Sequence, residues 1–193
     1  MTSNQLKNSE FHLKPAEIKK VIYAAKNFRD RCLVKTFAHT AIRRAELAAL
    51  NIRDIDFNRN LIEIRNGKGG KSRTVPMSGD LANDLGHLIG YRKSGPVFLS
   101  QRDGPLTLRQ VNWIVAQVGK ASGVKNPNSR YQYITCHLFR HSFAREWKRH
   151  GGSIETLSKI LGHTSVKTTL DEYGTEDLAD VQDNYRKIIQ QVF

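Results

Sequence analysis

The sequence has little that would place the protein in a membrane, outside the cell or around a metal ion. It contains no run of ~18 apolar residues, the length of a membrane-spanning helix. The N-terminal stretch MTSNQLKNSEFHLKP is polar where a signal peptide would be apolar. Only two cysteines occur, Cys32 and Cys136, in hydrophobic helical patterns without metal-binding or redox spacing. We therefore expect reduced core thiols in a cytoplasmic protein that does not associate with membranes.

Acidic residues are also few, so the chain is strongly basic. Eighteen Asp and Glu residues face 31 Lys and Arg residues, which gives a formal charge of +13. Such an excess favours a polyanionic partner, although a generally basic soluble protein is the alternative. With 193 residues, 39% of them hydrophobic, the chain is long enough for one well-packed domain.

The first quarter of the chain has helical periodicity. Residues 1–12 lack any apolar pattern and are expected to form a flexible lead-in. Pro15 is suited to open the first helix, and apolar residues at helical spacing follow it. Thr40 is the predicted N-cap of a further helix over 41–50.

A different pattern follows over residues 51–77, where isoleucines alternate with charged residues among Asn and Gly. This predicts a small antiparallel sheet with a glycine-rich hairpin at NGKGGK. Helical spacing resumes near residue 81 and continues into an amphipathic C-terminal helix. The predicted fold class is therefore mainly α with a small antiparallel β-sheet (α+β), in one domain over residues 13–193.

The helix predicted within TCHLFRHSFAREWKRHGG has an aromatic face and a polar face. Three aromatic residues recur every four positions: Phe139, Phe143 and Trp147. His137 and His141 lie on the roughly opposite side, four residues apart like the zinc ligands of a metalloprotease. Leu138 stands where the catalytic Glu would be, and Arg140 lies beside the pair, so we predict no metal site.

The run GKGGKS imitates the end of a phosphate-binding loop, but Arg65 occupies the position of its first glycine. The run also lies between two predicted strands rather than between a strand and a helix, so no nucleotide site is expected. The remaining candidate functional residues are arginines, histidines and a tyrosine. Guanidinium groups match the paired oxygens of a phosphoryl group, so these residues suit phosphodiester chemistry without a metal.

Four segments carry a family resemblance: TAIRRAEL (40–47), GKGGKSRTVP (67–76), HLFRHSFA (137–144) and LGHTSVKTTLDEY (161–173). In order and spacing they resemble the catalytic domain of tyrosine recombinases, the phage-integrase family, over about residues 13–190. The resemblance implies the tyrosine recombinase catalytic-domain fold. It also implies an enzyme that cleaves and rejoins DNA strands through a 3′-phosphotyrosyl intermediate, without ATP, metal or cofactor, in integration, excision or resolution of DNA.

The resemblance assigns the phosphate-binding and leaving-group residues. Arg43 and Arg140 clamp the scissile phosphate, and Glu46 supports Arg43 from the next helical turn. Lys68, at the tip of the predicted hairpin, matches the lysine that protonates the leaving 5′ hydroxyl, while Lys71 is expected to be a solvated hairpin lysine. Neighbouring arginines disfavour the charge of a lysine at this place, which suits it to act as an acid.

The resemblance also assigns the nucleophile. His137 assists proton transfer from the tyrosine, His163 hydrogen-bonds the phosphoryl oxygens, and Tyr173 attacks the phosphate. Tyr173 lies ten residues after His163, whereas many members of the family have nine and this chain has Glu172 there. We interpret the spacing as a loop longer by one residue.

The partners implied by the resemblance are double-stranded DNA and further copies of the chain, in a tetrameric synapse on the DNA. The C-terminal helix is expected either to dock into a neighbouring protomer or to fold back onto its own core. Family members usually carry an N-terminal core-binding domain before the catalytic domain. We expect that domain to be absent here, in an excised catalytic domain or a naturally short recombinase.

Two other functions use the same residues. A type IB topoisomerase-like enzyme shares the cleavage chemistry but relaxes DNA without pairing two sites. A DNA-binding accessory protein keeps the fold without turnover. Covalent capture of DNA separates the accessory protein from the two enzymes, and recombinant products separate the recombinase from the topoisomerase.

Overall fold

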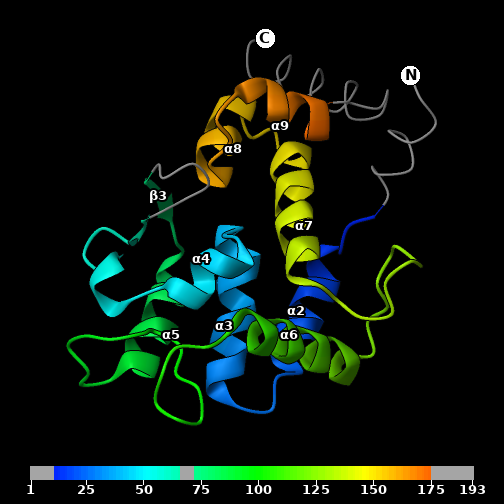
Figure 1. Ribbon diagram of the computed structural model, residues 1–193. Coiled ribbons are helices and arrows are strands. Elements are labelled where there is room, and N and C mark those ends of the chain that lie inside the picture. Colours follow the sequence, from blue (N-terminus) through cyan, green and yellow to red (C-terminus); the bar gives the residue numbers. More distant parts are fainter. Residues whose placement is uncertain (1–10, 66–71, 175–193) are drawn as a thin grey trace.

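The computed structural model describes residues 11–65 and 72–174, and over these residues the chain is mainly helical with one small antiparallel sheet (Figure 1). The predicted fold class is confirmed. The elements in chain order are α2 (Pro15–Tyr23), α3 (Phe28–Thr40), α4 (Arg44–Ala49), the 3-10 helix η1 (Ile52–Asp54), β1 (Ile55–Asp56), β2 (Leu61–Ile64), β3 (Arg73–Pro76), α5 (Gly79–Ile89), α6 (Leu108–Ser122), α7 (Cys136–Arg149), α8 (Ile154–Leu161) and α9 (Val166–Tyr173).

Short polar side chains begin most of these helices. The residues Asn27, Ser78, Thr107, Thr135 and Ser153 each have an extended backbone, and each side chain accepts a hydrogen bond from an N–H group of the first turn. This satisfies one of the four N–H groups that a helix start leaves without an intrahelical partner. The starts of α3, α5, α6, α7 and α8 are thus fixed by local sequence.

Thr40 does not cap a new helix, so that prediction was wrong. It is the last residue of α3, and its hydroxyl donates to the carbonyl of Thr36 at 2.5 Å. A threonine hydroxyl can bond back to its own helix instead of capping the next one. Ala41 then turns the chain with a left-handed φ of 52°, and α4 begins only at Arg44.

The three strands pair in the order β1-β2-β3, and both pairings are antiparallel. Ile62 of β2 lies opposite Ile55 of β1 and Val75 of β3. All three side chains are buried, so this face of the sheet belongs to the core. The hairpin between β2 and β3, with Lys68, lies outside the described residues.

Two groups of buried side chains hold the helices together. The larger contains Phe37 of α3 and Phe139 of α7, whose rings stack at 6.5 Å. The smaller lies between α7, α8 and α9 and contains Ala41, Ala144, Leu157, Leu161 and Tyr173. Figure 1 shows α7 running from the layer of α2, α3 and α6 to the α8–α9 pair, so both groups share this helix.

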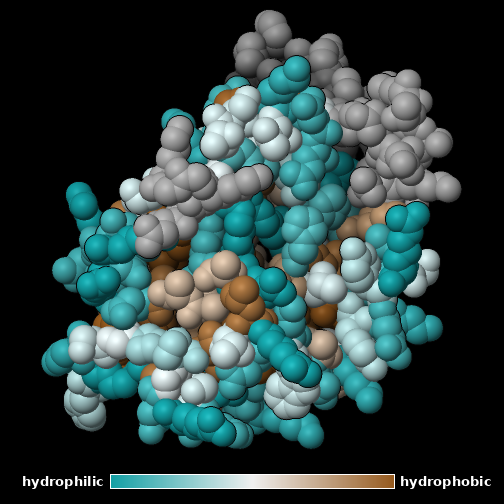
Figure 2. All heavy atoms as spheres, viewed as in Figure 1, coloured by the Kyte–Doolittle hydropathy of each residue, from teal (hydrophilic) through white to brown (hydrophobic). Residues whose placement is uncertain are grey.

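Both cysteines are buried and free, in agreement with the prediction of core thiols. Burial raises the pKa of each thiol to about 12, so neither is a thiolate at neutral pH. Over residues 11–65 and 72–174, no helix has the length and apolar character that crossing a bilayer requires. The face in Figure 2 is largely hydrophilic and is hollowed near its centre.

Candidate active site

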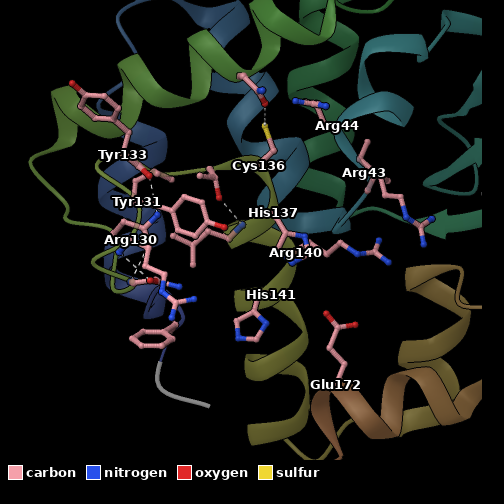
Figure 3. A pocket seen from close by; sticks show the side chains of 18 of the residues that line it. Arg43, Arg44, Arg130, Tyr131, Tyr133, Cys136, His137, Arg140, His141 and Glu172 are labelled. Carbon is pink, nitrogen blue, oxygen red and sulfur yellow. Dashed lines mark hydrogen bonds between the residues drawn. The ribbon is translucent and has the colours of Figure 1, made fainter. Parts of the chain in front are cut away.

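A cavity of about 1570 Å³ lies between α4, α7 and the α8–α9 pair (Figure 3). Four of the residues predicted for the site line it: Arg43, His137, Arg140 and His163. They come from the start of α4, from α7 and from the turn after α8. The fold therefore brings together side chains that lie up to 120 positions apart in the sequence.

The end of α8 sets the geometry of this cavity. Gly162 has a left-handed φ of 64°, and its N–H donates to the carbonyl of Lys159, while the N–H of His163 donates to that of Ser158. This pair of bonds is the usual glycine stop of a helix. The carbonyls of Ile160, Leu161 and Gly162 remain for other donors, and each receives an arginine side chain.

Arg140 is the most buried of the cationic residues in the cavity, with 5% of its surface exposed. It donates to the carbonyls of Leu161 and Ala41, each at 2.7 Å, and lies 3.2 Å from Nε2 of His163. The left-handed turn at Ala41 thus places a backbone acceptor for Arg140. Carbonyl oxygens hold the guanidinium in place without neutralising its charge.

The pKa of Arg140 is lowered to about 10, first by burial and then by the charge of Arg43. The group is still a cation at neutral pH. Two like charges held close in a partly dry cavity create a strong positive potential. An anion that enters the cavity relieves this repulsion, so the arrangement favours phosphate binding.

Arg43 is held by Glu46, as expected. Its backbone N–H donates to one oxygen of Glu46 at 2.7 Å, and its guanidinium donates to the other at 2.9 Å. A longer bond of 3.3 Å joins Arg43 to the carbonyl of Gly162. Burial tends to raise the pKa of Glu46, but hydrogen bonds from Arg73 and from the backbone and side chain of Arg43 lower it to about 2. The carboxylate is therefore ionised and fixes the direction of the Arg43 side chain.

Contacts on both ring nitrogens hold His163 in one orientation, and a carboxylate oxygen of Glu172 also lies 4.0 Å from Nε2. Nδ1 lies 2.8 Å from the hydroxyl of the buried Thr169, and Nε2 faces Arg140. Because an arginine only donates, Nε2 must accept, and the proton of the neutral ring lies on Nδ1. Burial, and then the charge of Arg140, lower the pKa of His163, which favours this neutral form.

Tyr173 is not among the residues that line the cavity. It is the last residue of α9, none of its surface is exposed, and its ring lies 5.4 Å from that of His141. Its hydroxyl donates to Glu172 at 3.1 Å. Burial, and then the neighbouring carboxylate, raise the pKa of Tyr173 well above the ordinary value of 10.

Two residues of the site have no role in the sequence analysis. Arg73 at the start of β3 contacts Glu46 and the end of α8, and its only sequence signal is its place within GKGGKSRTVP. Glu172 lines the cavity and holds the hydroxyl of Tyr173; its sequence signal is the ninth place after His163. Lys68, the predicted acid, lies outside the described residues.

Comparison with known proteins agrees with these features. The phage integrase family matches residues 12–178. Tyrosine recombinase XerC of Chlamydia caviae is 36% identical over 149 residues, which cover 74% of this chain and 46% of that protein. Tyrosine recombinase XerA of Pyrococcus horikoshii is 30% identical, over 79% of this chain and 53% of the relative. The chain thus spans about half the length of these relatives.

Solved structures of the same kind superpose well. A crystal structure of XerA recombinase matches with a TM-score of 0.77 and 30% identity, over 91% of this chain and 64% of that one. The Tn1549 transposon integrase in complex with transposon right end DNA matches with a TM-score of 0.73, over 93% of this chain and 66% of that one. Its identity is 19%, so this second match shows the fold alone.

Proposed function

The chain belongs to the phage integrase family, and from that premise we propose that it cleaves and rejoins strands of duplex DNA as a site-specific recombinase. The observation that carries the proposal is the meeting of Arg43 and Arg140 in one cavity with His163 beside them. The net charge of +13 and the relatives named as tyrosine recombinases support duplex DNA as the partner. Further copies of this chain, in a tetrameric synapse, are part of the proposal.

The scissile phosphate binds between the two arginines. Each guanidinium has five N–H groups. Contacts among the described residues use two N–H groups of Arg43 and three N–H groups of Arg140. The others are available for the oxygens of a phosphodiester, which they match in pairs. Such preorganised donors stabilise the charge that develops on the phosphoryl oxygens during transfer.

The chemistry is an exchange of one phosphate ester for another. The oxygen of Tyr173 attacks phosphorus, and the bond from phosphorus to the 5′ oxygen breaks. The tyrosine oxygen is then joined to the 3′ phosphate as a new ester. The proton of Tyr173 passes to a neighbouring acceptor with the help of His137, and the leaving 5′ oxygen takes a proton from Lys68. Attack by a 5′ hydroxyl reverses every step, and the covalent link conserves the bond energy, so ATP is not needed.

During the reaction, Nε2 of His163 donates a hydrogen bond to a phosphoryl oxygen, whereas in the free protein Nε2 accepts one from Arg140. The bound phosphate attracts the donors of Arg140 and raises the pKa of the imidazole, since it is an anion beside the ring. A protonated Nε2 then faces the phosphate. The bond from Nδ1 to Thr169 keeps the ring in the same plane during this change.

Tyr173 must leave its buried position before it reacts. Its ring packs in the smaller core group, and its hydroxyl is bound to Glu172, which lines the cavity although Tyr173 does not. We propose that DNA binding shifts α9 so that the hydroxyl reaches the phosphate. The free protein is then a resting state in which the nucleophile is protonated and shielded.

A cleavage assay on nicked duplexes with randomised sequence around the nick tests the proposal, because loss of the short strand beyond the cleavage traps the covalent product. We expect a covalent protein–DNA band for the natural sequence, and a loss of at least about 100-fold in rate for Arg43→Ala or Arg140→Ala. Cleavage at an unchanged rate in both variants would refute the mechanism. Relaxation of plasmid without recombinant products would favour the topoisomerase-like enzyme, and binding without a covalent band the accessory protein.

A further inference from the structure

Arg73 lies at the start of β3 and joins the sheet to the phosphate-binding cavity. Its side chain is 11% exposed. Two of its nitrogens donate to the two oxygens of Glu46, at 2.7 and 2.8 Å, and Nε donates to the carbonyl of Ile160 at 2.9 Å. This is the paired geometry in which an arginine binds a carboxylate most strongly. All three nitrogens of the guanidinium are thus engaged with protein groups.

The contact with Glu46 also determines what Arg43 can do. The carboxylate accepts two hydrogen bonds from Arg73 and two from Arg43, one of these from the backbone. An ionised carboxylate has about four acceptor positions, so all of them are filled. If Arg73 were removed, two positions would open, and the carboxylate would no longer be held in one orientation against Arg43.

Arg73 supports the second anchor of Arg43 as well. A Cβ atom added to Gly162 would lie 2.6 Å from Cδ and 2.8 Å from Nε of Arg73, so the arginine stem occupies the space that only a glycine leaves. The carbonyl of Gly162 is the group that Arg43 binds at 3.3 Å. Arg73 therefore bonds Glu46, one of the two groups that orient Arg43, and packs beside Gly162, the residue that carries the other.

We propose that Arg73 is a positioning residue, which fixes the guanidinium of Arg43 for the phosphate by bridging Glu46 and the last turn of α8. The proposal rests on the proposed function, because it assigns Arg43 to the scissile phosphate. Arg73 does not itself line the cavity, and each of its three side-chain nitrogens donates to Glu46 or Ile160. It acts through Arg43 rather than on the DNA.

The first test compares single-turnover cleavage by Arg73→Met and Arg73→Lys with that of the natural sequence. We expect Arg73→Met to lower the cleavage rate at saturating DNA by about 10- to 100-fold, since a misplacement near 1 Å costs this much. DNA affinity should change by less than about threefold, because Arg73 makes no contact with the phosphate. Lysine gives an intermediate rate, since it keeps the charge but cannot bind two oxygens as a fork.

Lys35→Met is the matched control. The side chain of Lys35 is 10% exposed and forms ion pairs with Asp80 and Asp84, so its removal takes away another largely buried cation outside the cavity. We expect a loss of stability with an unchanged rate per folded molecule. An equal loss of rate in Lys35→Met and Arg73→Met would show a general effect of stability and would overturn the proposal.

Double variants test whether Arg73 acts through Arg43. Arg43→Lys keeps a cation but loses the fork that Glu46 and Gly162 orient. If Arg73 works through Arg43, adding Arg73→Met to Arg43→Lys should lower the rate by less than about twofold further, because coupled residues are not additive. A full multiplication of the two losses would mean that Arg73 acts by another route, and would overturn the proposal.

A measurement without DNA separates this proposal from the proposed function. Nitrogen-15 NMR spectra of the arginine side chains, assigned with Arg43→Lys, show whether rotation of the Arg43 guanidinium is restricted. We expect restricted rotation in the natural sequence and in Lys35→Met, and averaged signals in Arg73→Met. Unchanged Arg43 signals in Arg73→Met would overturn the positioning role. If the natural sequence never forms a covalent link with DNA, the proposed function is refuted, but the NMR spectra still decide whether Arg73 positions Arg43.

Discussion

Replacement of Glu46 by glutamine tests the electrostatics of the cavity most simply. The carboxylate of Glu46 is bound by both Arg43 and Arg73, and 6% of its side chain is exposed. Glutamine keeps the shape of the side chain, but it removes the negative charge and places an amide NH₂ against an arginine. The variant therefore leaves two guanidinium groups close together without their counter-ion.

The pKa of Glu46 gives the size of the effect. A shift from an ordinary value of 4.5 to about 2 means that folding is stabilised by roughly 3 kcal/mol through the ionised carboxylate. For a chain of this size, such a loss lowers Tm by about 6 to 12 °C. Glu46→Gln should therefore be destabilised by roughly 3 kcal/mol at pH 7, in the range found when one partner of a buried ion pair is removed.

The pH dependence has a definite sign. The folded pKa of Glu46 lies below the unfolded one, so its contribution is complete above pH 4.5 and is lost as the pH falls toward 2. Near pH 3 it should be reduced to about half. The difference in stability between the natural sequence and Glu46→Gln should therefore shrink as the solution is acidified.

Urea denaturation followed by circular dichroism, at several pH values from 7 to 3, measures this difference. Glu63→Gln on strand β2 is the control. A carboxylate oxygen of Glu63 lies 2.7 Å from a guanidinium nitrogen of Arg65, but both side chains are about half exposed. It should cost less than about 1 kcal/mol. A difference below 1 kcal/mol for Glu46→Gln at pH 7, or one that does not shrink on acidification, would refute the reasoning.

Two further substitutions test the glycine stop of α8 and the environment of the nucleophile. Gly162→Ala should lower the cleavage rate far more than Gly123→Ala. Both glycines have a left-handed φ, 64° and 68°, but only a Cβ at position 162 would collide with Arg73. Equal losses of rate in the two variants would contradict this expectation. Glu172→Gln should lower the pKa of Tyr173, because the carboxylate charge and hydrogen bond help to raise it. An ultraviolet titration of tyrosinate, taken as the difference from Tyr173→Phe, measures that pKa, and an unchanged value would show that burial alone sets it.

The cavity could be predicted from the sequence where local signals fix the backbone. The left-handed φ of Gly162 ends α8, and His163 follows it into the cavity, although no sequence pattern had located this helix. On the aromatic face of α7, Phe139 is fully buried while Phe143 and Trp147 are partly buried, and Arg140 faces Ala41 and Leu161. The aromatic spacing thus located α7, whereas the position of Arg140 also depends on Ala41 and Leu161, which belong to other segments.

Other features depend on contacts between distant segments. Arg73 is an ordinary strand arginine in the sequence, and it is buried because α8, 87 positions later, places the carbonyl of Ile160 against it. The sequence likewise gave no indication that Tyr173 would be enclosed, since that follows from packing against Ala144 and Leu161. Thr40 was misassigned because its hydroxyl has two competing backbone partners. Tertiary packing decided each of these cases.

The most direct test of the account is to find the residue that becomes joined to DNA. The protein is incubated with the nicked duplexes, denatured, digested with nuclease and trypsin, and analysed by mass spectrometry beside Tyr173→Phe. The account predicts a nucleotide remnant on Tyr173 of the natural sequence and none in the variant. A remnant on another residue, such as Tyr185, or an equal adduct in Tyr173→Phe, would contradict it.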